Sequence, residues 1–536
     1  MIGLVTKSMN QFKIWKISLS RIFHTSCYLR MEPGASKNVD NTKAGQKHRL
    51  VPECLMKPIK PIIKFDQSWK QPKVVIVGSG MAGLSAAERL LEHGLTNFTI
   101  LEALGRPGGR IHTCLMQNAK IDLGSDEILG ANLANAAFSL AVSEKVATTR
   151  DMFLSPYYTL DGLVIYEINR PYSIIKNAFT KAATLFLADK RVKSSLRSYI
   201  DPLLREAVSD IPDPEKTEHN LVMNGMMNEI QVLWGDNLSN ISADYYGSYI
   251  RIPAGRVIIK DGGKTLIDPL LEKVKEKIRF NKPVQNIRWD NKSCELTNRG
   301  SVLCCDGEEI PCDFVICTVS LGVLKAQADT FFSPPLPFEK LEAINNLGFG
   351  HVNYIFLEYD KPFWGPGEGI MKIGWSPTAL QETESWVRSI GCFKEVAPRI
   401  LRVDVGGREA VQTESCSSSI LAEDITNFLR KLTGDPSIPC PVSVMRSKWS
   451  TDIYFMGAKS FLGLSSSVRD QCALACPIPA ACDPPPIVLF AGEATVPGFF
   501  STLHGARLSG IREADRILKL SVTYQGPPCS KVILLF

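Results

Sequence analysis

The chain has 536 residues, of which 45% are hydrophobic and 22% charged, and this length and composition are typical of a soluble protein with two or more domains. Its formal net charge of +6 comes from a basic surplus in residues 1–75, since the remainder is slightly acidic, and this distribution argues against a nucleic-acid-binding surface. No apolar run in the sequence approaches the roughly 20 residues of a membrane-spanning helix.

The first thirty residues contain no acidic residue, and as a helix they would place Phe12, Trp15 and Leu19 opposite basic side chains. This pattern resembles a mitochondrial transit peptide, while a disordered basic tail or translation from Met31 are the alternatives. The 15 cysteines form no CxxC pair, which favours free thiols in a reducing compartment. We therefore expect an intracellular, cytoplasmic protein, with mitochondrial import as the alternative, and a flexible lead-in over residues 1–72.

A strand–helix–strand unit is predicted to open the folded part of the chain. The apolar run 74–77 predicts a buried parallel strand, and the segment 81–93 predicts a helix that stops at Gly94. The segment FTIL predicts a second strand, which ends at Glu102. The length is that of a βαβ unit, from which open parallel sheets are built.

Gly78, Gly80 and Gly83 form a GxGxxG motif between the first strand and the helix. In this position the glycines permit a tight turn, the close approach of a pyrophosphate and the close packing of helix on strand, while the helix N-terminus attracts phosphate charge. Glu102 stands where a carboxylate can accept hydrogen bonds from a ribose diol. The motif therefore predicts a dinucleotide site.

The segment ALGRPGGRI follows Glu102 and places Arg106 and Arg110 around a Gly-Gly pair. A guanidinium beside a backbone that a ligand can approach closely offers a second contact to a diphosphate. NAD-binding units do not usually need this second contact, so the segment favours FAD over NAD.

Two later segments repeat the theme of a strand followed by a turn or helix. Residues 311–324 suggest a buried strand and turn, and residues 489–514 suggest an apolar strand, an aromatic loop and a helix. Glu493 follows this last strand, at what we expect to be the carboxyl end of the sheet, where open α/β sheets bind ligands. The mixed regions 151–254 and 336–484 are interpreted as an inserted second domain.

Five motifs together resemble the flavin-containing amine oxidase family, in particular its polyamine oxidase branch, over about residues 73–520: GSGMAGLSAAERL, EALGRPGGRI, ILGANLAN, PFWGP and LFAGEAT…STLHGARLSG. The resemblance implies an α/β fold, with a Rossmann-like FAD-binding domain built from discontinuous segments and an α+β substrate-binding domain. The expected FAD-binding segments are 73–150, 255–335 and 485–525, and the expected substrate-binding segments are 151–254 and 336–484.

The resemblance also implies positions for the flavin, with Glu493 at its ribityl chain and Thr502 and Leu503 beneath its ring. Members that bind flavin covalently use a cysteine in this region, and this stretch has none, so we expect non-covalent FAD. The predicted FAD-binding residues are Gly78, Gly80, Met81, Ala82, Gly83, Glu102, Arg106, Arg110, Gly124, Ser125, Val284, Glu493, Thr502 and Leu503.

The reaction implied by the resemblance is oxidation of a C–N bond of a neutral amine, with O₂ reduced to H₂O₂. The expected substrate is a small amine, either a polyamine or an acetylated polyamine, and a monomer is the expected state. Aromatic walls suit this reaction because they flank the amine without adding a charge. The candidate substrate-binding residues are Tyr454, Phe461, Thr502 and Glu127, with Asp126 as a second carboxylate; core aromatics and solvated acids are the alternative interpretation.

Two positions depart from the family pattern. In GFGHVNYIFLEY, Tyr354 stands where the family typically has a lysine that holds a water against the flavin, which makes Tyr354 the candidate catalytic residue. Leu129 stands where animal polyamine oxidases have a histidine. Loss of the lysine charge should slow flavin reoxidation. The alternative function is therefore a flavin-binding scaffold or regulator with weak or no oxidase activity.

Overall fold

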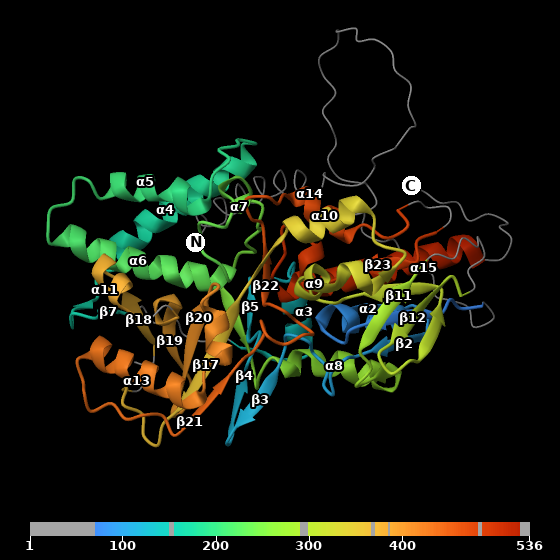
Figure 1. Ribbon diagram of the computed structural model, residues 1–536, viewed down its shortest axis with the longest axis horizontal. Coiled ribbons are helices and arrows are strands. Elements are labelled where there is room, and N and C mark those ends of the chain that lie inside the picture. Colours follow the sequence, from blue (N-terminus) through green and yellow to red (C-terminus); the bar gives the residue numbers. More distant parts are fainter. Residues whose placement is uncertain are drawn as a thin grey trace, which may run out of the picture.

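The computed structural model describes residues 70–148, 155–289, 298–365, 370–383, 386–480 and 485–525. The segment that resembles a transit peptide and most of the lead-in lie outside these residues. Figure 1 shows two neighbouring halves, one around a parallel sheet and the other around a larger mixed sheet. Within the described residues no helix combines the length and apolarity needed to cross a bilayer.

The first half is centred on five parallel strands in the order β10-β2-β1-β14-β23. These strands are β1 (Val74–Val77), β2 (Phe98–Leu101), β10 (Ile278–Arg279), β14 (Phe314–Cys317) and β23 (Val488–Phe490). The helices on one face are α2 (Met81–Glu92), α8 (Lys264–Val274) and α15 (Leu503–Gln525). Val74 and Ile76 face these helices, whereas Val75 and Val77 face a second core cluster. Because both faces are covered, the strands β1, β14 and β23 have continuous apolar sequences.

The predicted α/β fold class is confirmed, and the first βαβ unit agrees with its prediction to within one residue. Gly94 follows α2 with φ of 82°, a left-handed conformation that favours glycine. The segment 311–324 differs from the prediction, because its first two residues belong to a strand of another sheet. Asp313 separates the two strands, and its carboxylate accepts hydrogen bonds from the Lys73 and Asn298 backbone amides at 2.7 and 2.6 Å.

A four-stranded sheet in the order β13-β12-β11-β15 lies beside the parallel sheet. Its strands are β11 (Val284–Arg288), β12 (Gly300–Cys304), β13 (Glu309–Cys312) and β15 (Phe332–Ser333). The helices nearby are α9 (Leu321–Phe331), α10 (Phe338–Asn346) and α14 (Val468–Ala475).

The second half is built on a seven-stranded sheet in the order β21-β17-β20-β19-β18-β7-β8. Figure 1 shows α4, α5 and α6 on one side of this sheet and α13 on the other. The strands are β7 (Tyr157–Thr159), β8 (Val164–Ile165), β17 (Val352–Glu358), β18 (Ile370–Gly374), β19 (Ile390–Ala397), β20 (Ile400–Gly406) and β21 (Ser443–Arg446). The helices are α4 (Asn169–Leu187), α5 (Leu196–Ala207), α6 (Glu215–Trp234) and α13 (Ser418–Thr433).

Short elements join the halves. Small sheets are formed by β3 (Thr113–Met116) with β4 (Ala119–Asp122), by β9 (Arg256–Ile259) with β5 (Glu127–Leu129) and β6 (Ala147–Thr148), and by β16 (Gly348–Gly350) with β22 (Lys459–Phe461). The remaining helices are α3 (Ala136–Ser143), α7 (Ala243–Tyr246), α11 (Pro377–Glu382), α12 (Ala410–Ser415), η2 (Lys275–Lys277), η3 (Val387–Ser389) and η4 (Glu493–Thr495).

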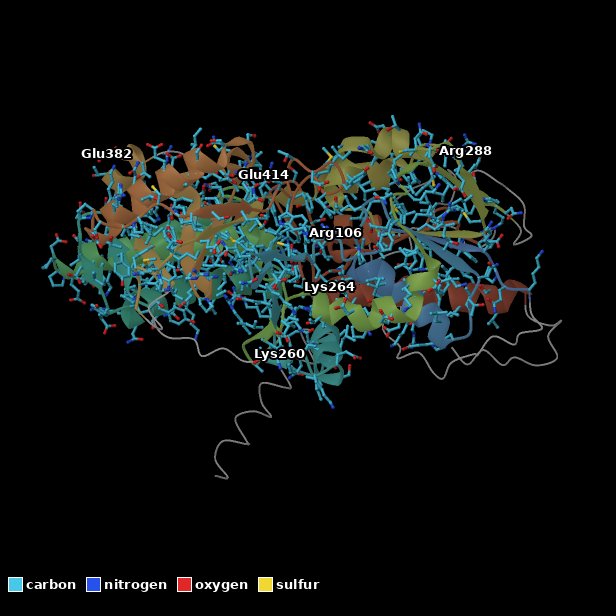
Figure 2. All side chains as sticks on the ribbon, turned by 90° about the horizontal axis from the view of Figure 1, so that it is seen from below. Arg106, Lys260, Lys264, Arg288, Glu382 and Glu414 are labelled. Atoms are coloured by element: carbon cyan, nitrogen blue, oxygen red, sulfur yellow. The ribbon has the colours of Figure 1, made fainter. Side chains whose placement is uncertain are left out.

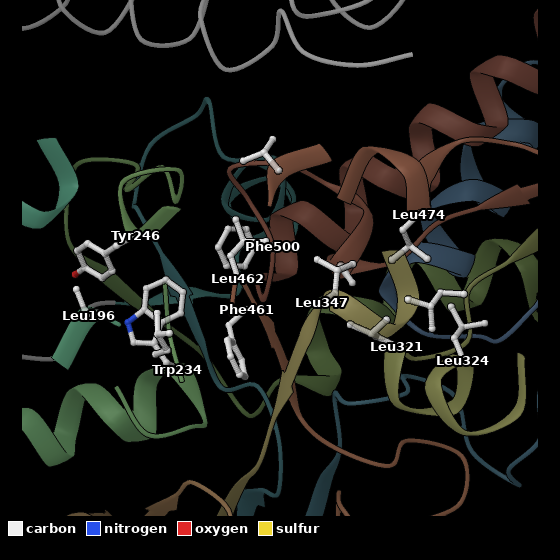
Figure 3. Close-up of a cluster of buried hydrophobic side chains, with 14 of the residues drawn as sticks. Leu196, Trp234, Tyr246, Leu321, Leu324, Leu347, Phe461, Leu462, Leu474 and Phe500 are labelled. Atoms are coloured by element: carbon white, nitrogen blue, oxygen red, sulfur yellow. The ribbon is translucent and has the colours of Figure 1, made fainter. Parts of the chain in front are cut away.

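One hydrophobic cluster extends across the junction of the halves. It contains Trp234 and Tyr246 of the helical layer, Phe461 and Phe500 in the middle, and Leu321 of α9 (Figure 3). Because these side chains form a continuous core, the two halves pack directly on each other. The predicted domain boundaries themselves stay a prediction.

Candidate functional site

A long cavity lies at the carboxyl edge of the parallel sheet, and its wall is assembled from segments far apart in the sequence. The predicted FAD-binding residues on this wall are Gly78, Gly80, Met81, Ala82, Glu102, Arg110, Ser125, Val284, Glu493, Thr502 and Leu503. Three others, Gly83, Arg106 and Gly124, are not among the residues that line it. The arrangement fits the rule that open α/β sheets bind ligands outside the carboxyl ends of their strands.

The glycine turn has a specific steric role at each position. Gly78 has φ of 102°, and a Cβ there would lie 2.6 Å from Thr318 Oγ1. A Cβ on Gly83 would lie 2.0 Å from the Gly78 carbonyl oxygen, so only glycine lets α2 pack this closely on β1. Gly80 bridges to Gly108, which brings two backbone segments to one side of the cavity. This leaves backbone amides at the start of α2 open to a phosphate group.

Glu102 is buried at the end of β2, where its carboxylate is oriented by the glycine turn. It accepts hydrogen bonds from the Ser79 amide at 2.9 Å, the Ser79 hydroxyl at 2.6 Å and the Leu104 amide at 2.9 Å. A carboxylate has about four lone-pair positions, so capacity for a ribose hydroxyl remains.

The two arginines of the Gly-Gly segment have different positions. Arg106 donates to the Gly109 carbonyl at 3.0 Å and so braces the turn from behind, near the middle of the molecule (Figure 2). Burial lowers the pKa of Arg106, and Glu102 opposes this in part. Arg110 lies on the wall, 3.1 Å from Glu493. Gly124 lets the Arg110 backbone approach, because a Cβ there would lie 1.9 Å from its carbonyl oxygen.

Glu493 connects three parts of the site. Besides the ion pair with Arg110, its carboxylate accepts hydrogen bonds from the Ser460 hydroxyl at 2.5 Å and the Ser501 amide at 2.6 Å. These contacts fix the loop that leads to α15. The side chain is almost fully buried yet still forms part of the wall.

The N-terminus of α15 faces the same cavity. Thr502 precedes the helix, and its hydroxyl accepts a hydrogen bond from the Gly505 amide at 3.0 Å, as an N-cap does. Burial lowers the pKa of the adjacent His504 to about 4, so this ring is neutral near pH 7. The helix therefore presents its positive dipole end, without a charged histidine, beside Thr502 and Leu503.

The candidate substrate-binding residues are only partly brought together. Tyr454 and Thr502 lie on the wall. Phe461 does not, because its ring packs in the central core, where a Cβ on Gly348 would lie 2.4 Å from it (Figure 3). Glu127 is also absent from the wall, and it forms an ion pair of 3.3 Å with Arg256.

Tyr354 lies beneath a buried charge network instead of on the cavity wall. The Arg402 guanidinium covers its ring at 4.3 Å, and Arg402 in turn binds Asp126 at 2.5 Å and Asp404 at 2.7 Å. Burial raises the pKa of Tyr354, and Arg402 offsets this only in part. Leu129, the other departure, is half-buried in β5 and is also absent from the wall.

Sequence reasoning missed several wall residues, of which Lys459 of β22 is the most informative. The signal was an ionisable residue among the aromatic candidates of this segment, in the run MGAKSF. Other missed wall residues include Thr318, Val319, Ser320, Val323, Gln327, Phe331, Ile453 and Phe455. Within the described residues no group of three or more His, Cys, Asp or Glu side chains could hold a metal ion.

Comparison with known proteins identifies similar chains along nearly the whole fold. Residues 81–518 match the family model described as flavin containing amine oxidoreductase. The peroxisomal N(1)-acetyl-spermine/spermidine oxidases of Homo sapiens and Bos taurus are 32% and 31% identical over 487 and 486 residues, which cover 84% of this chain and 95% of each relative. Polyamine oxidase 1 of Oryza sativa subsp. japonica is 28% identical over 513 residues, covering 84% of this chain and 98% of the relative.

A solved structure shares the fold. It is a double mutant of putrescine oxidase from a redesign of cofactor binding, with a TM-score of 0.63 and 17% identity. The match covers 84% of this chain and 99% of that chain.

Proposed function

The chain belongs to the flavin-containing amine oxidoreductase family, and from this premise we propose that it binds FAD non-covalently and oxidises a C–N bond of an amine. The proposed substrate is a polyamine or an acetylated polyamine, because relatives similar along most of their length are named as oxidases of such amines. The observation that carries the proposal is the one cavity whose wall joins the glycine turn, Glu102, Arg110 and the start of α15.

The residues on the wall fit the parts of FAD. The Gly78–Gly80 turn and the start of α2 would hold the pyrophosphate, and Glu102 would accept the ribose hydroxyls. The N-terminus of α15 at Thr502 and Leu503 would lie next to the flavin ring, where its dipole favours negative charge.

The cysteines of the described chain support a non-covalent cofactor. Cys305 lies on the wall, but its amide bonds to the Pro283 carbonyl at 2.9 Å, beside Val284 of the four-stranded sheet. No cysteine lies in the described residues 485–525, which hold Thr502 and Leu503.

When bound, FAD would supply the acceptor for a hydride from the carbon next to the amine nitrogen, with O₂ as the final electron acceptor. The protein chain would position the amine and exclude water from the site. Tyr454, Phe455 and Leu503 provide apolar surface that would flank the amine and exclude water, and Thr502 and Ser501 provide hydroxyls. A neutral amine held in this way needs no charged partner.

A second candidate function, flavin binding with weak or no oxidase activity, is favoured by the position of Tyr354. Its ring is covered by Arg402 and does not reach the cavity wall, so it cannot replace a lysine there. Oxygen chemistry would then lack the charge that the family lysine supplies.

The test is anaerobic titration of the purified protein with spermine, spermidine and their N1-acetyl forms. Bleaching of bound flavin by any of these amines, followed by H₂O₂ release on admission of air, supports the amine oxidase. The control is a diol as long as the amine, which has no C–N bond and should therefore not bleach the flavin. Bound FAD that none of the amines bleaches supports the second candidate, and protein that stays colourless after incubation with FAD overturns both.

A further inference from the structure

Lys459 is a lysine among the residues that line the cavity, as are Tyr454, Thr502 and Leu503. It begins β22, where it pairs with Gly350 of β16. Its Nζ donates one hydrogen bond, to the Leu233 carbonyl at the end of α6, at 3.2 Å. The side chain is half-buried. Strand pairing fixes the backbone of Lys459, and the hydrogen bond to the end of α6 fixes its Nζ.

The other charged groups of the wall are already engaged. Arg110 and Glu493 form an ion pair of 3.1 Å, and Lys282 lies 2.7 Å from Glu308. Glu102 accepts three hydrogen bonds from neighbouring amide and hydroxyl groups. In the described part of the chain, Lys459 forms no ion pair with a carboxylate within 4.0 Å. Among the charged residues that line the cavity, Lys459 is therefore the amine available to exchange a proton with a ligand.

Four charged groups act on Lys459 electrostatically, from three other strands and a loop. They are Glu127 of β5, Asp404 of β20, Asp126, and Arg256 of β9. Each acid has its own cation: Glu127 lies 3.3 Å from Arg256, Asp126 lies 2.5 Å from Arg402, and Asp404 lies 2.7 Å from Lys394. Burial lowers the pKa of Lys459, and the three acids offset this only in part.

Oxidation of an amine requires the neutral form, yet alkylamines with a pKa of about 10.4 are only about one part in a thousand neutral at about pH 7.4. A proton acceptor beside the substrate removes this limit, and such groups contribute roughly 10²- to 10⁴-fold to rates.

We propose that Lys459, in its neutral form, accepts the proton that the substrate ammonium must lose before its C–N bond is oxidised. One N–H bond of the substrate breaks and its electron pair stays on the substrate nitrogen, while an N–H bond forms at Lys459 Nζ. The resulting Lys459 ammonium returns the proton to water as the product leaves. This inference rests on the proposed function, since it assigns a role in the same reaction.

The test compares FAD-loaded wild type with K459Q, K459R and the control K120Q, which changes an exposed lysine of β4. The readout is the rate of anaerobic flavin bleaching between about pH 6 and 11. K459Q and K459R should be slower than wild type by roughly 10²-fold near pH 7 and should recover as the pH approaches the pKa of the free amine. K120Q should follow the wild type.

A second readout requires no turnover. Brief acetylation with limiting acetic anhydride modifies only neutral amines, so the extent of modification of Lys459 against pH, measured by mass spectrometry, reports its ionisation. The midpoint for Lys459 should lie below that of exposed Lys120 in the same protein. A midpoint at or above that of Lys120 overturns the proposal.

The outcomes separate the two proposals. If wild type is bleached and K459Q follows the same pH profile, the base role is wrong and the oxidase function stands. If K459Q is faster, Lys459 is a repelling ammonium and the base role is also wrong. If no amine bleaches wild type, the oxidase function fails, and the base role fails with it whatever the acetylation shows.

Discussion

The Arg402 guanidinium lies over the ring of Tyr354, with 4.3 Å between its central carbon and the ring centroid. Two acids, Asp126 and Asp404, already face two cations, Arg402 and Lys394, in this buried cluster. Tyr354, the candidate catalytic residue of the sequence analysis, is therefore part of a charge-balanced packing unit.

Replacement of Tyr354 by lysine should destabilise the protein. Y354K removes the ring from Arg402 and adds a third cation, so we expect the free energy of unfolding to fall by about 2–4 kcal/mol. Urea unfolding followed by tryptophan fluorescence measures this change. The control Y354F keeps the ring and should stay within about 0.5 kcal/mol of wild type. A Y354K protein that is as stable as wild type and bleaches faster would show that this side chain reaches the cavity.

Asp404 should make stability depend on pH in the acid range. Burial raises the pKa of Asp404, but Arg402 and Lys394 lower it further, to about 2. Since this lies below the unfolded value of about 3.9, the ionised group contributes roughly 2 kcal/mol above about pH 4, and this is lost as the pH falls toward about 2.

D404N should therefore be less stable than wild type at pH 7 and should lose less stability between about pH 4 and 2. Unfolding midpoints in urea across this range provide the measurement. The exposed Asp329 offers a matched control, and D329N should retain the slope of wild type. Parallel slopes for D404N and wild type would contradict the assignment.

The third glycine of the GxGxxG motif should be intolerant of even one methyl group. In G83A the added Cβ would meet a backbone oxygen at 2.0 Å, which forces α2 away from β1, so we expect FAD content to fall by more than about tenfold. Absorbance of the purified protein near the flavin maximum measures it. In G105A the nearest atom is the movable Asn281 side chain at 3.3 Å, and this variant should keep its flavin.

The carboxylate of Glu102 should contribute to FAD affinity. E102Q removes a charged acceptor, and hydrogen bonds to charged groups contribute about 1.5–3 kcal/mol, so the Kd for FAD should rise roughly 10- to 100-fold. Quenching of flavin fluorescence on titration of apoprotein gives the Kd. E309Q changes an exposed residue of β13, and this control should bind as wild type does. Equal affinity of E102Q and wild type would exclude the ribose contact.

The bounds of the βαβ unit could be predicted almost to the residue because residues within the unit itself determine them. The apolar run 74–77 must be buried on both faces, and Gly78 and Gly94 mark its turns. Phe461 could not be placed in the same way. Alternation in β22 puts Phe461 on the same side as Lys459, which lines the cavity, but the Phe461 ring packs in the core against Gly348, which is more than a hundred residues away in sequence.

Tyr354 shows a second limit of sequence reasoning. The motif shows that Tyr354 stands where the resemblance predicts a lysine. It does not show that the tyrosine ring contacts Arg402, which comes from an adjacent strand of the sheet. Nothing near Tyr354 in the sequence marks this contact. Lys459 was overlooked because the resemblance drew attention to the aromatic residues of its segment, although Lys459 lines the cavity as Tyr454 does.

The cavity wall draws on β1, α9, β22 and α15, which are near both ends and the middle of the described chain. A ligand that fills this cavity therefore binds only the folded protein and stabilises it against unfolding. At a free ligand concentration one hundred times the Kd, this stabilisation is about 2.7 kcal/mol. Cellular abundance of this protein should then follow the supply of riboflavin, with chains made during vitamin shortage degraded first.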